Sequence, residues 1–216
     1  MLPNAYKLGT ANFYGYDFIV NPSTLIPRPE TEQLVERTVV LVKKHLSESP
    51  RILDLGTGSG AIAITLKKLL PAAAVEASDL SPQALRVASQ NTEQNQVKVT
   101  FHHGSLFTPI TGVFDLVIAN LPYVPSHRWP LIEAQVRLHE PISAIVAGVD
   151  GLDLIKGFCR GVGAHLKSSS IVALEIDDTH GPRVLKLLQT ALPSHRCWIE
   201  KDLAGFDRFA FAEPRT

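Results

Sequence analysis

The chain has 216 residues, enough for one domain with a sizeable hydrophobic core. Its 21 basic side chains are balanced by 21 acidic ones, which weighs against a nucleic-acid substrate because phosphate binding usually leaves a basic surplus. No apolar run approaches the ~18 residues of a membrane span, and no signal peptide is evident at the start. The two cysteines show no CxxC spacing, so we expect reduced thiols. Together these features predict a cytoplasmic protein without a membrane partner.

The front of the chain, residues 1–28, is expected to form a β-hairpin and a proline-rich connector. Aromatic and polar residues alternate across residues 6–20, which is typical of a short hairpin. Three prolines within residues 21–29 predict a stiff connector. A helix is expected to begin at Pro29, because proline suits the first helical turn and the two glutamates that follow complement the helix dipole.

Residues 29–216 are expected to form one domain in which strands and helices alternate. After the helix at Pro29, strands are predicted at residues 51–55, 74–78, 97–102, 115–119 and 170–176, and helices at residues 60–70, 82–94, 151–166 and 182–192. Residues 196–201 and 208–212 can form a terminal antiparallel pair. This alternation predicts an α/β fold with a mostly parallel sheet and helices on both faces.

A glycine-rich turn follows the first of these strands and opens a helix; residues 54–60 read Asp-Leu-Gly-Thr-Gly-Ser-Gly. Gly56 and Gly58 let the backbone turn tightly and approach a ligand, and Gly60 allows the helix to pack closely on the strand. The GxGxG spacing differs from the dinucleotide GxGxxG, so a pyrophosphate is not required. Asp54 can take a ligand ammonium group or anchor the amides of the loop.

Asp79 strengthens the interpretation of the glycine-rich turn as part of a ligand site, because it directly follows the second predicted strand. An acid at this position can accept hydrogen bonds from two ribose hydroxyls. Asp79 could instead cap the helix expected at residue 82, although Ser81 competes for that role. The glycine turn, the strand and the acid together favour a ligand that contains a nucleoside.

The most informative stretch, residues 115–125, reads Asp-Leu-Val-Ile-Ala-Asn-Leu-Pro-Tyr-Val-Pro. Its apolar part predicts a buried strand, so Asn120 would lie at the carboxyl end of a strand, where open α/β sheets bind ligands. The Asn120 oxygen and the Leu121 carbonyl could accept both hydrogens of a flat NH2 group, with Pro122 forcing a turn and Tyr123 packing against the face of that group. An ordinary strand and turn would have the same pattern.

A nucleoside ligand without a phosphate motif, combined with this turn, indicates methyl transfer from S-adenosylmethionine. An amide nitrogen is a poor nucleophile, so the hypothesis is that Asn120 and the Leu121 carbonyl orient it and stabilise its developing positive charge. No side chain is then required as the base. The histidines show no ligand spacing, and no metal site is expected.

Several further segments complete a pattern that covers residues 13–212. They are Leu-Ile-Pro-Arg-Pro-Glu-Thr-Glu at residues 25–32, Asp-Leu-Ser-Pro-x-Ala-Leu at 79–85, Glu-Pro at 140–141, Gly-x-Asp-Gly-Leu at 148–152, Leu-Glu-Ile at 174–176 and Lys-Asp-Leu-Ala-Gly-Phe-Asp-Arg at 201–208. With the glycine loop, they resemble the protein-(glutamine-N5) methyltransferases that modify peptide-chain release factors. The proline-rich segment is the most specific of these motifs.

The resemblance implies a class I S-adenosylmethionine-dependent methyltransferase fold, Rossmann-like, with a seven-stranded, mostly parallel sheet and an antiparallel terminal strand. The implied acceptor is the glutamine amide of the Gly-Gly-Gln motif in release factors. The cofactor would contact Asp54, Gly56, Thr57, Gly58, Ser59, Gly60, Asp79, Leu106 and Asn120. The acceptor amide would contact Asn120, Leu121, Pro122 and Tyr123, with Arg28 as a secondary candidate near the substrate channel.

Three features depart from the family pattern. The family turn is usually Asn-Pro-Pro-Tyr, whereas Leu121 stands here in place of the first proline; Pro122 still favours an extended conformation at Leu121. Ser105 replaces the acid that usually precedes the adenine-facing position. The family also carries a helical domain ahead of the hairpin, whereas this chain begins almost at the hairpin.

Other functions remain open at this point. Asn-Leu-Pro-Tyr also occurs in ribosomal-RNA adenine dimethylases, so an adenine N6-methyltransferase acting on RNA or DNA is the main alternative. A methyltransferase for another protein or a small molecule would share the same site. A cofactor-binding subunit without catalysis is the third possibility.

Overall fold

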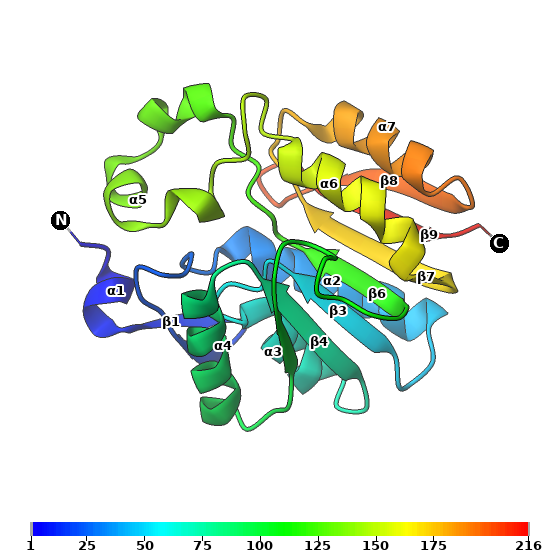
Figure 1. Cartoon of the computed structure of the whole chain (residues 1–216), viewed down its shortest axis with the longest axis horizontal. Helices are drawn as coiled ribbons and strands as arrows, with labels where there is room; N and C mark the ends of the chain where they lie inside the picture. Colours follow the sequence, from blue (N-terminus) through cyan, green and yellow to red (C-terminus); the bar gives the residue numbers. More distant parts are fainter. Residues whose placement is uncertain (1, 216) are drawn as a thin grey trace.

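The computed structural model describes residues 2–215 and contains a seven-stranded sheet covered by helices on both faces (Figure 1). The strands of the sheet are β3 (Arg51–Leu55), β4 (Ala74–Asp79), β5 (Thr100–His103), β6 (Phe114–Ala119), β7 (Leu166–Glu175), β8 (His195–Lys201) and β9 (Asp207–Pro214). Their order is β5-β4-β3-β6-β7-β9-β8, and β9 runs antiparallel to both of its neighbours. The predicted fold class, including the antiparallel terminal strand, is confirmed.

The helices divide into two layers that cover opposite faces of the sheet. They are α2 (Pro29–His45), α3 (Ala61–Leu69), α4 (Pro82–Gln94), α6 (Asp153–Gly161) and α7 (Gly181–Ala191). In β6, Leu116 and Ile118 pack in the same cluster as α2 and α3, while Val117 and Ala119 pack with α6 and α7. Both faces of this strand are therefore apolar, as expected for a parallel strand buried from both sides.

The chain reverses its direction of travel across the sheet at β3. It proceeds from β3 to β4 and β5 at one edge and then returns to β6 on the other side of β3. The carboxyl ends of β3 and β6 are followed by loops that leave in opposite directions, which opens a crevice at that edge of the sheet. The residues after these two strands are therefore positioned to bind a ligand.

The front of the chain forms a short helix and the predicted hairpin. Its elements are α1 (Asn4–Leu8), β1 (Thr10–Phe13) and β2 (Tyr16–Ile19). The helix was not predicted, because five residues are too few for a periodic pattern. Phe13 and Phe18 are completely buried in the same core cluster as α2 and α3.

Asn91, in α4, joins the hairpin to the glycine loop. Its Oδ1 accepts a hydrogen bond from the Ile19 amide at 2.6 Å, and its Nδ2 donates to the Ile19 carbonyl at 3.0 Å and to the Ser59 carbonyl at 2.8 Å. Asn91 is completely buried, so these bonds satisfy polar groups that water does not reach. A single side chain, Asn91, therefore holds both the hairpin and the glycine loop.

The largest difference from the sequence-based expectations lies between β6 and α6. Three short helices fill this connection: η1 (Ser126–Leu131), α5 (Ala134–His139) and η2 (Ile142–Ala144). None of the residues in these helices is buried, and Leu131, Leu138 and Ile142 are exposed, so no amphipathic period marks these helices in the sequence.

Other boundaries also differ from the prediction, most of all between α6 and β7. The helix expected at residues 151–166 ends at Gly161, followed by η3 (Val162–His165), and β7 begins at Leu166 rather than at residue 170. Phe107 packs directly against Gly161, so the glycine that weakens the helix also makes room for an aromatic ring. No helix within residues 2–215 combines the length and the apolar character needed to cross a bilayer.

Candidate functional site

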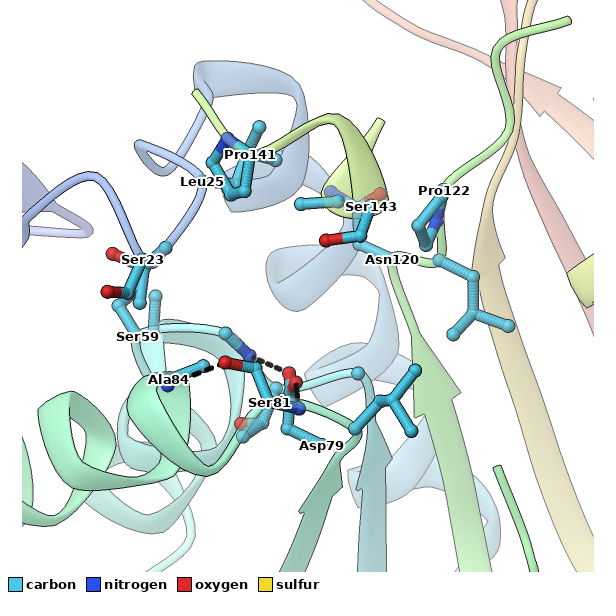
Figure 2. Close-up of a pocket in the computed structure, with 18 of the residues that line it drawn as sticks. Ser23, Leu25, Ser59, Asp79, Ser81, Ala84, Asn120, Pro122, Pro141 and Ser143 are labelled. Carbon is cyan, nitrogen blue, oxygen red and sulfur yellow. Dashed lines mark hydrogen bonds between the residues drawn. The ribbon is translucent and has the colours of Figure 1, made fainter. Parts of the chain in front are cut away.

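A cavity of about 510 Å³ lies at the carboxyl ends of β3, β4 and β6. Figure 2 shows Asp79 and Ser81 below it, Asn120 and Pro122 to its right, and Leu25 above it next to Pro141. The predicted site residues that line it are Arg28, Gly56, Thr57, Gly58, Ser59, Asp79, Leu106, Asn120, Leu121 and Pro122. The crevice expected from the strand order therefore contains most of the predicted residues.

The glycine loop curves around one side of the cavity. Gly56 has a φ of +71°, and a Cβ added there would lie 3.0 Å from Cδ2 of Leu121, so the position requires glycine for both its conformation and its space. The amides of Gly56 and Thr57 donate to the Ser78 carbonyl at 2.8 and 3.0 Å. Gly60 does not line the cavity; it precedes α3 and packs against α4.

Asp54 lies beneath the loop rather than in the cavity. Its side chain is completely buried, and its Oδ2 accepts a hydrogen bond from Thr57 Oγ1 at 2.6 Å. Asp54 therefore anchors the loop through the Thr57 hydroxyl, whereas the amides of Gly56 and Thr57, which it was predicted to hold, donate to the Ser78 carbonyl. Burial raises the pKa of the Asp54 carboxyl to about 7, since the charged form has lost its hydration.

This shift predicts a pH-dependent contribution of Asp54 to stability. The folded protein keeps the proton up to about pH 7, whereas the unfolded chain releases it near its ordinary pKa of 3.8. The stability contributed by neutral Asp54 is therefore fully present below the unfolded pKa and is lost as the pH rises through about 7, with a slope of at most about 1.4 kcal/mol per pH unit. Asp54→Asn should remove this pH-dependent part of the stability. The measurement is the free energy of unfolding in urea for both proteins, from a pH near 3.8 to a pH above 7. Identical slopes in the two proteins would contradict the prediction.

Asp79 is the last residue of β4 and holds the glycine loop from the other side. Its Oδ2 accepts from the Gly58 amide and its Oδ1 from the Ser81 amide, both at 2.8 Å. Ser81 caps α4 by accepting from the Ala84 amide at 3.1 Å, so the capping role that Asp79 could have had belongs to Ser81. Burial raises the pKa of Asp79. Each of its oxygens keeps a second lone pair for a ligand hydroxyl.

Asn120 lies immediately after β6 on the wall of the cavity. Its Nδ2 donates to Thr31 Oγ1 at 3.0 Å. Leu121 lines the cavity beside Asn120, and its side chain is buried against the core. Tyr123 is not among the lining residues; its hydroxyl donates to Glu175 Oε1 at 3.2 Å, and burial raises its pKa. The structure therefore places the Tyr123 ring behind the turn rather than against the position expected for an acceptor.

Thr31 lines the cavity and Glu175 contacts it from behind, and neither residue was predicted from the sequence. Thr31 Oγ1 donates to Glu175 Oε2 at 2.6 Å, and both side chains are buried. Both belong to segments already recognised, at residues 25–32 and 174–176. For Glu175, an acid at the end of an apolar strand was the available signal; Thr31 stands among charged residues and has no comparable signal.

Arg28 joins two segments that close the cavity on the side away from Asp79. Its Nη2 donates to Glu140 Oε1 at 2.6 Å, and the Glu140 side chain is only 1% exposed. Residues 23–28 come from the connector, and residues 141–144 include η2. Arg28 thus lies at the site as predicted, and its side chain forms an ion pair with Glu140.

Comparison with known proteins identifies the relatives of this chain. The methyltransferase small domain family matches residues 32–135. The release factor glutamine methyltransferase of Enterococcus faecalis is 42% identical over 98% of this chain and 76% of its own length. The protein of the same name from Gloeobacter violaceus is 40% identical over 96% of this chain and 73% of its own length.

Solved structures show the same architecture. The release factor-specific protein-(glutamine-N5) methyltransferase from Alicyclobacillus acidocaldarius aligns with a TM-score of 0.56 at 26% identity, covering 92% of this chain and 100% of that one. A 16S rRNA N2 G1207 methyltransferase from T. thermophilus, solved with AdoMet and guanosine, aligns with a TM-score of 0.68 at 19% identity over 95% of this chain and 50% of its own. The fold is that of the class I methyltransferases, which use S-adenosylmethionine. The sequence relatives, the sheet and the residues at the carboxyl ends of its strands agree: this chain belongs to the release factor glutamine methyltransferase family.

Proposed function

We propose that this protein transfers the methyl group of S-adenosylmethionine to the side-chain nitrogen of the glutamine in the Gly-Gly-Gln motif of a peptide-chain release factor. The names of its relatives support this substrate. The observation that carries the chemistry is the Asn120 carboxamide, held at the carboxyl end of β6 on the wall of a cavity that the glycine loop and Asp79 also line.

The cavity fits S-adenosylmethionine in size and chemistry. Its volume of about 510 Å³ is typical of sites for ligands of this size. We expect Asp79 to hold the ribose hydroxyls, Leu106 to border the adenine, and residues 56–59 to surround the methionine part. When bound, the cofactor supplies an activated methyl group and its own leaving group.

Asn120 and Leu121 would position the acceptor. A primary amide presents two N–H groups, which need two acceptors once they leave water. Asn120 Oδ1 and the Leu121 carbonyl would be the two acceptors, and both carry the partial negative charge that favours positive charge developing on the nitrogen. The proton is released after the methyl group has been transferred, so no side chain is required as the base.

The direct test is methyl transfer from labelled S-adenosylmethionine to purified release factor or to ribosomal RNA. We expect label on the release factor and none on a release factor whose Gly-Gly-Gln glutamine is replaced by glutamate. Label on RNA alone would support an adenine N6-methyltransferase, the function that the Asn-Leu-Pro-Tyr turn also allows. Cofactor binding without label on either substrate would indicate a non-catalytic subunit.

A further inference from the structure

Three side chains from distant elements meet behind Asn120. Thr31 comes from the first turn of α2, Glu175 from the end of β7, and Tyr123 from the turn after β6. Glu175 accepts from Thr31 at 2.6 Å and from Tyr123 at 3.2 Å, and Thr31 in turn accepts from Asn120 at 3.0 Å. The result is a chain of hydrogen bonds that leads from the cavity wall into the core.

When Glu175 is ionised, only one arrangement of the hydrogen atoms satisfies this series of hydrogen bonds. A carboxylate only accepts, so the single hydrogen of the Thr31 hydroxyl goes to Glu175. The Thr31 oxygen is then left as an acceptor, and the carboxamide of Asn120 must turn its NH2 group toward it. The oxygen of the carboxamide therefore lies on the other side.

Asn120 Oδ1 is the end of the carboxamide that remains available. No donor among residues 2–215 reaches it, and it is not one of the buried side-chain atoms that lack a partner. It is thus accessible at a residue that lines the cavity. If the carboxamide were inverted, an oxygen would face the Thr31 oxygen without a hydrogen between them, and an NH2 group would face the acceptor.

Glu175 occupies an unusual position for a carboxyl group. It is 2% exposed, and within residues 2–215 no basic side chain forms an ion pair with it. The nearby charges are Arg208, which pairs with Asp202 instead, and Glu30. Burying a carboxyl group costs free energy, and here two hydroxyl groups rather than a cation compensate for the lost hydration.

We infer that Thr31 and Glu175 are positioning residues that fix Asn120 as a hydrogen-bond acceptor, and that this makes the site select a carboxamide over a carboxylate. The inference rests on the proposed function for the identity of the acceptor. A glutamine side chain offers N–H groups to Asn120 Oδ1 and the Leu121 carbonyl. A glutamate in the same place would bring oxygen against oxygen, and sites built around a substrate N–H reject analogues that lack it.

The first experiment compares Thr31→Val with Thr31→Ser. Binding of release factor carrying Gly-Gly-Gln or Gly-Gly-Glu is measured for each variant, together with kcat on the glutamine form and affinity for S-adenosylmethionine. Valine removes the hydroxyl at nearly constant volume, so the carboxamide is free to invert. We expect the preference for glutamine over glutamate and kcat to fall at least ~10-fold each, with cofactor affinity changed less than ~3-fold. Serine should recover most of both losses.

Thr38→Val is the matched control. Thr38 is buried in the same helix, and its Oγ1 donates to the Leu34 carbonyl, away from the cavity. The same chemical change there should leave the preference for glutamine as in the unaltered protein. If Thr31→Val keeps the full preference, or loses no more of it than Thr38→Val does, the inference is wrong.

A second measurement separates this inference from the proposed function. Hydrogen exchange of the Asn120 side-chain NH2 group, followed by NMR in the protein without acceptor, reports whether Thr31 holds that group. Protection that is lost in Thr31→Val and kept in Thr31→Ser supports the positioning role even if the release factor is not methylated. Equal exchange in all three proteins overturns it, whatever the substrate.

Discussion

Replacing Asn120 by alanine is expected to lower methyl transfer at least ~100-fold while leaving most of the affinity for S-adenosylmethionine intact. Losing one preorganised group that stabilises charge in the transition state typically has an effect of this size. In the proposed geometry Asn120 Oδ1 would face the acceptor nitrogen, which gains positive charge during transfer, whereas the glycine loop and Asp79 line other parts of the cavity. The measurement is kcat at saturating cofactor, with cofactor affinity from calorimetry.

The control for this variant is Asn12→Ala. Asn12 is an exposed asparagine in β1 that bonds to Asp17, so the same side chain is removed far from the cavity. We expect turnover close to that of the unaltered protein. Normal turnover in Asn120→Ala would contradict the proposed acceptor geometry, because Asn120 is the one side chain proposed to bind the acceptor amide.

Asp79→Asn is expected to weaken binding of S-adenosylmethionine by ~10- to 100-fold. Hydrogen bonds to a charged group are stronger than those between neutral groups, and asparagine provides one acceptor oxygen where Asp79 provides two. The two oxygens of Asp79 also hold the amides of Gly58 and Ser81, so the loop itself should become less ordered. The expected kinetic signature is a raised KM for the cofactor, with a smaller change in kcat at saturation.

Asp17→Asn provides the comparison for Asp79. Asp17 is an exposed acid of β2, outside the cavity lining, and neutralising it should not change cofactor affinity. If Asp79→Asn binds the cofactor as tightly as Asp17→Asn does, Asp79 does not belong to the cofactor site.

Local signals in the sequence were sufficient for most of the fold. The strand at Arg51–Leu55 and the helix at Pro82–Gln94 have the predicted bounds, since turn and capping residues mark their ends. Asn120 and Asp79 could be placed together because the carboxyl ends of parallel strands meet at one edge of the sheet.

Contacts between distant segments could not be read from the sequence. Thr31 and Glu175 are 144 residues apart in the chain, and no local pattern shows that a threonine in a helix meets a glutamate at the end of a strand. The short helices between β6 and α6 lack a buried stripe, so periodicity could not reveal them. Asp54 had two possible roles because only its burial, a tertiary property, decides between them.

The link from Asn91 to the hairpin has a consequence for how the protein folds during synthesis. The hairpin leaves the ribosome early, yet the side chain that receives it lies 72 residues further along the chain. Closing so large a loop is entropically unfavourable until the intervening strands and helices have formed. Phe13 and Phe18 can begin to pack against α2 and α3 before that, but the hydrogen bonds that join the hairpin to the glycine loop form only after α4 has emerged, so the hairpin reaches its final position late.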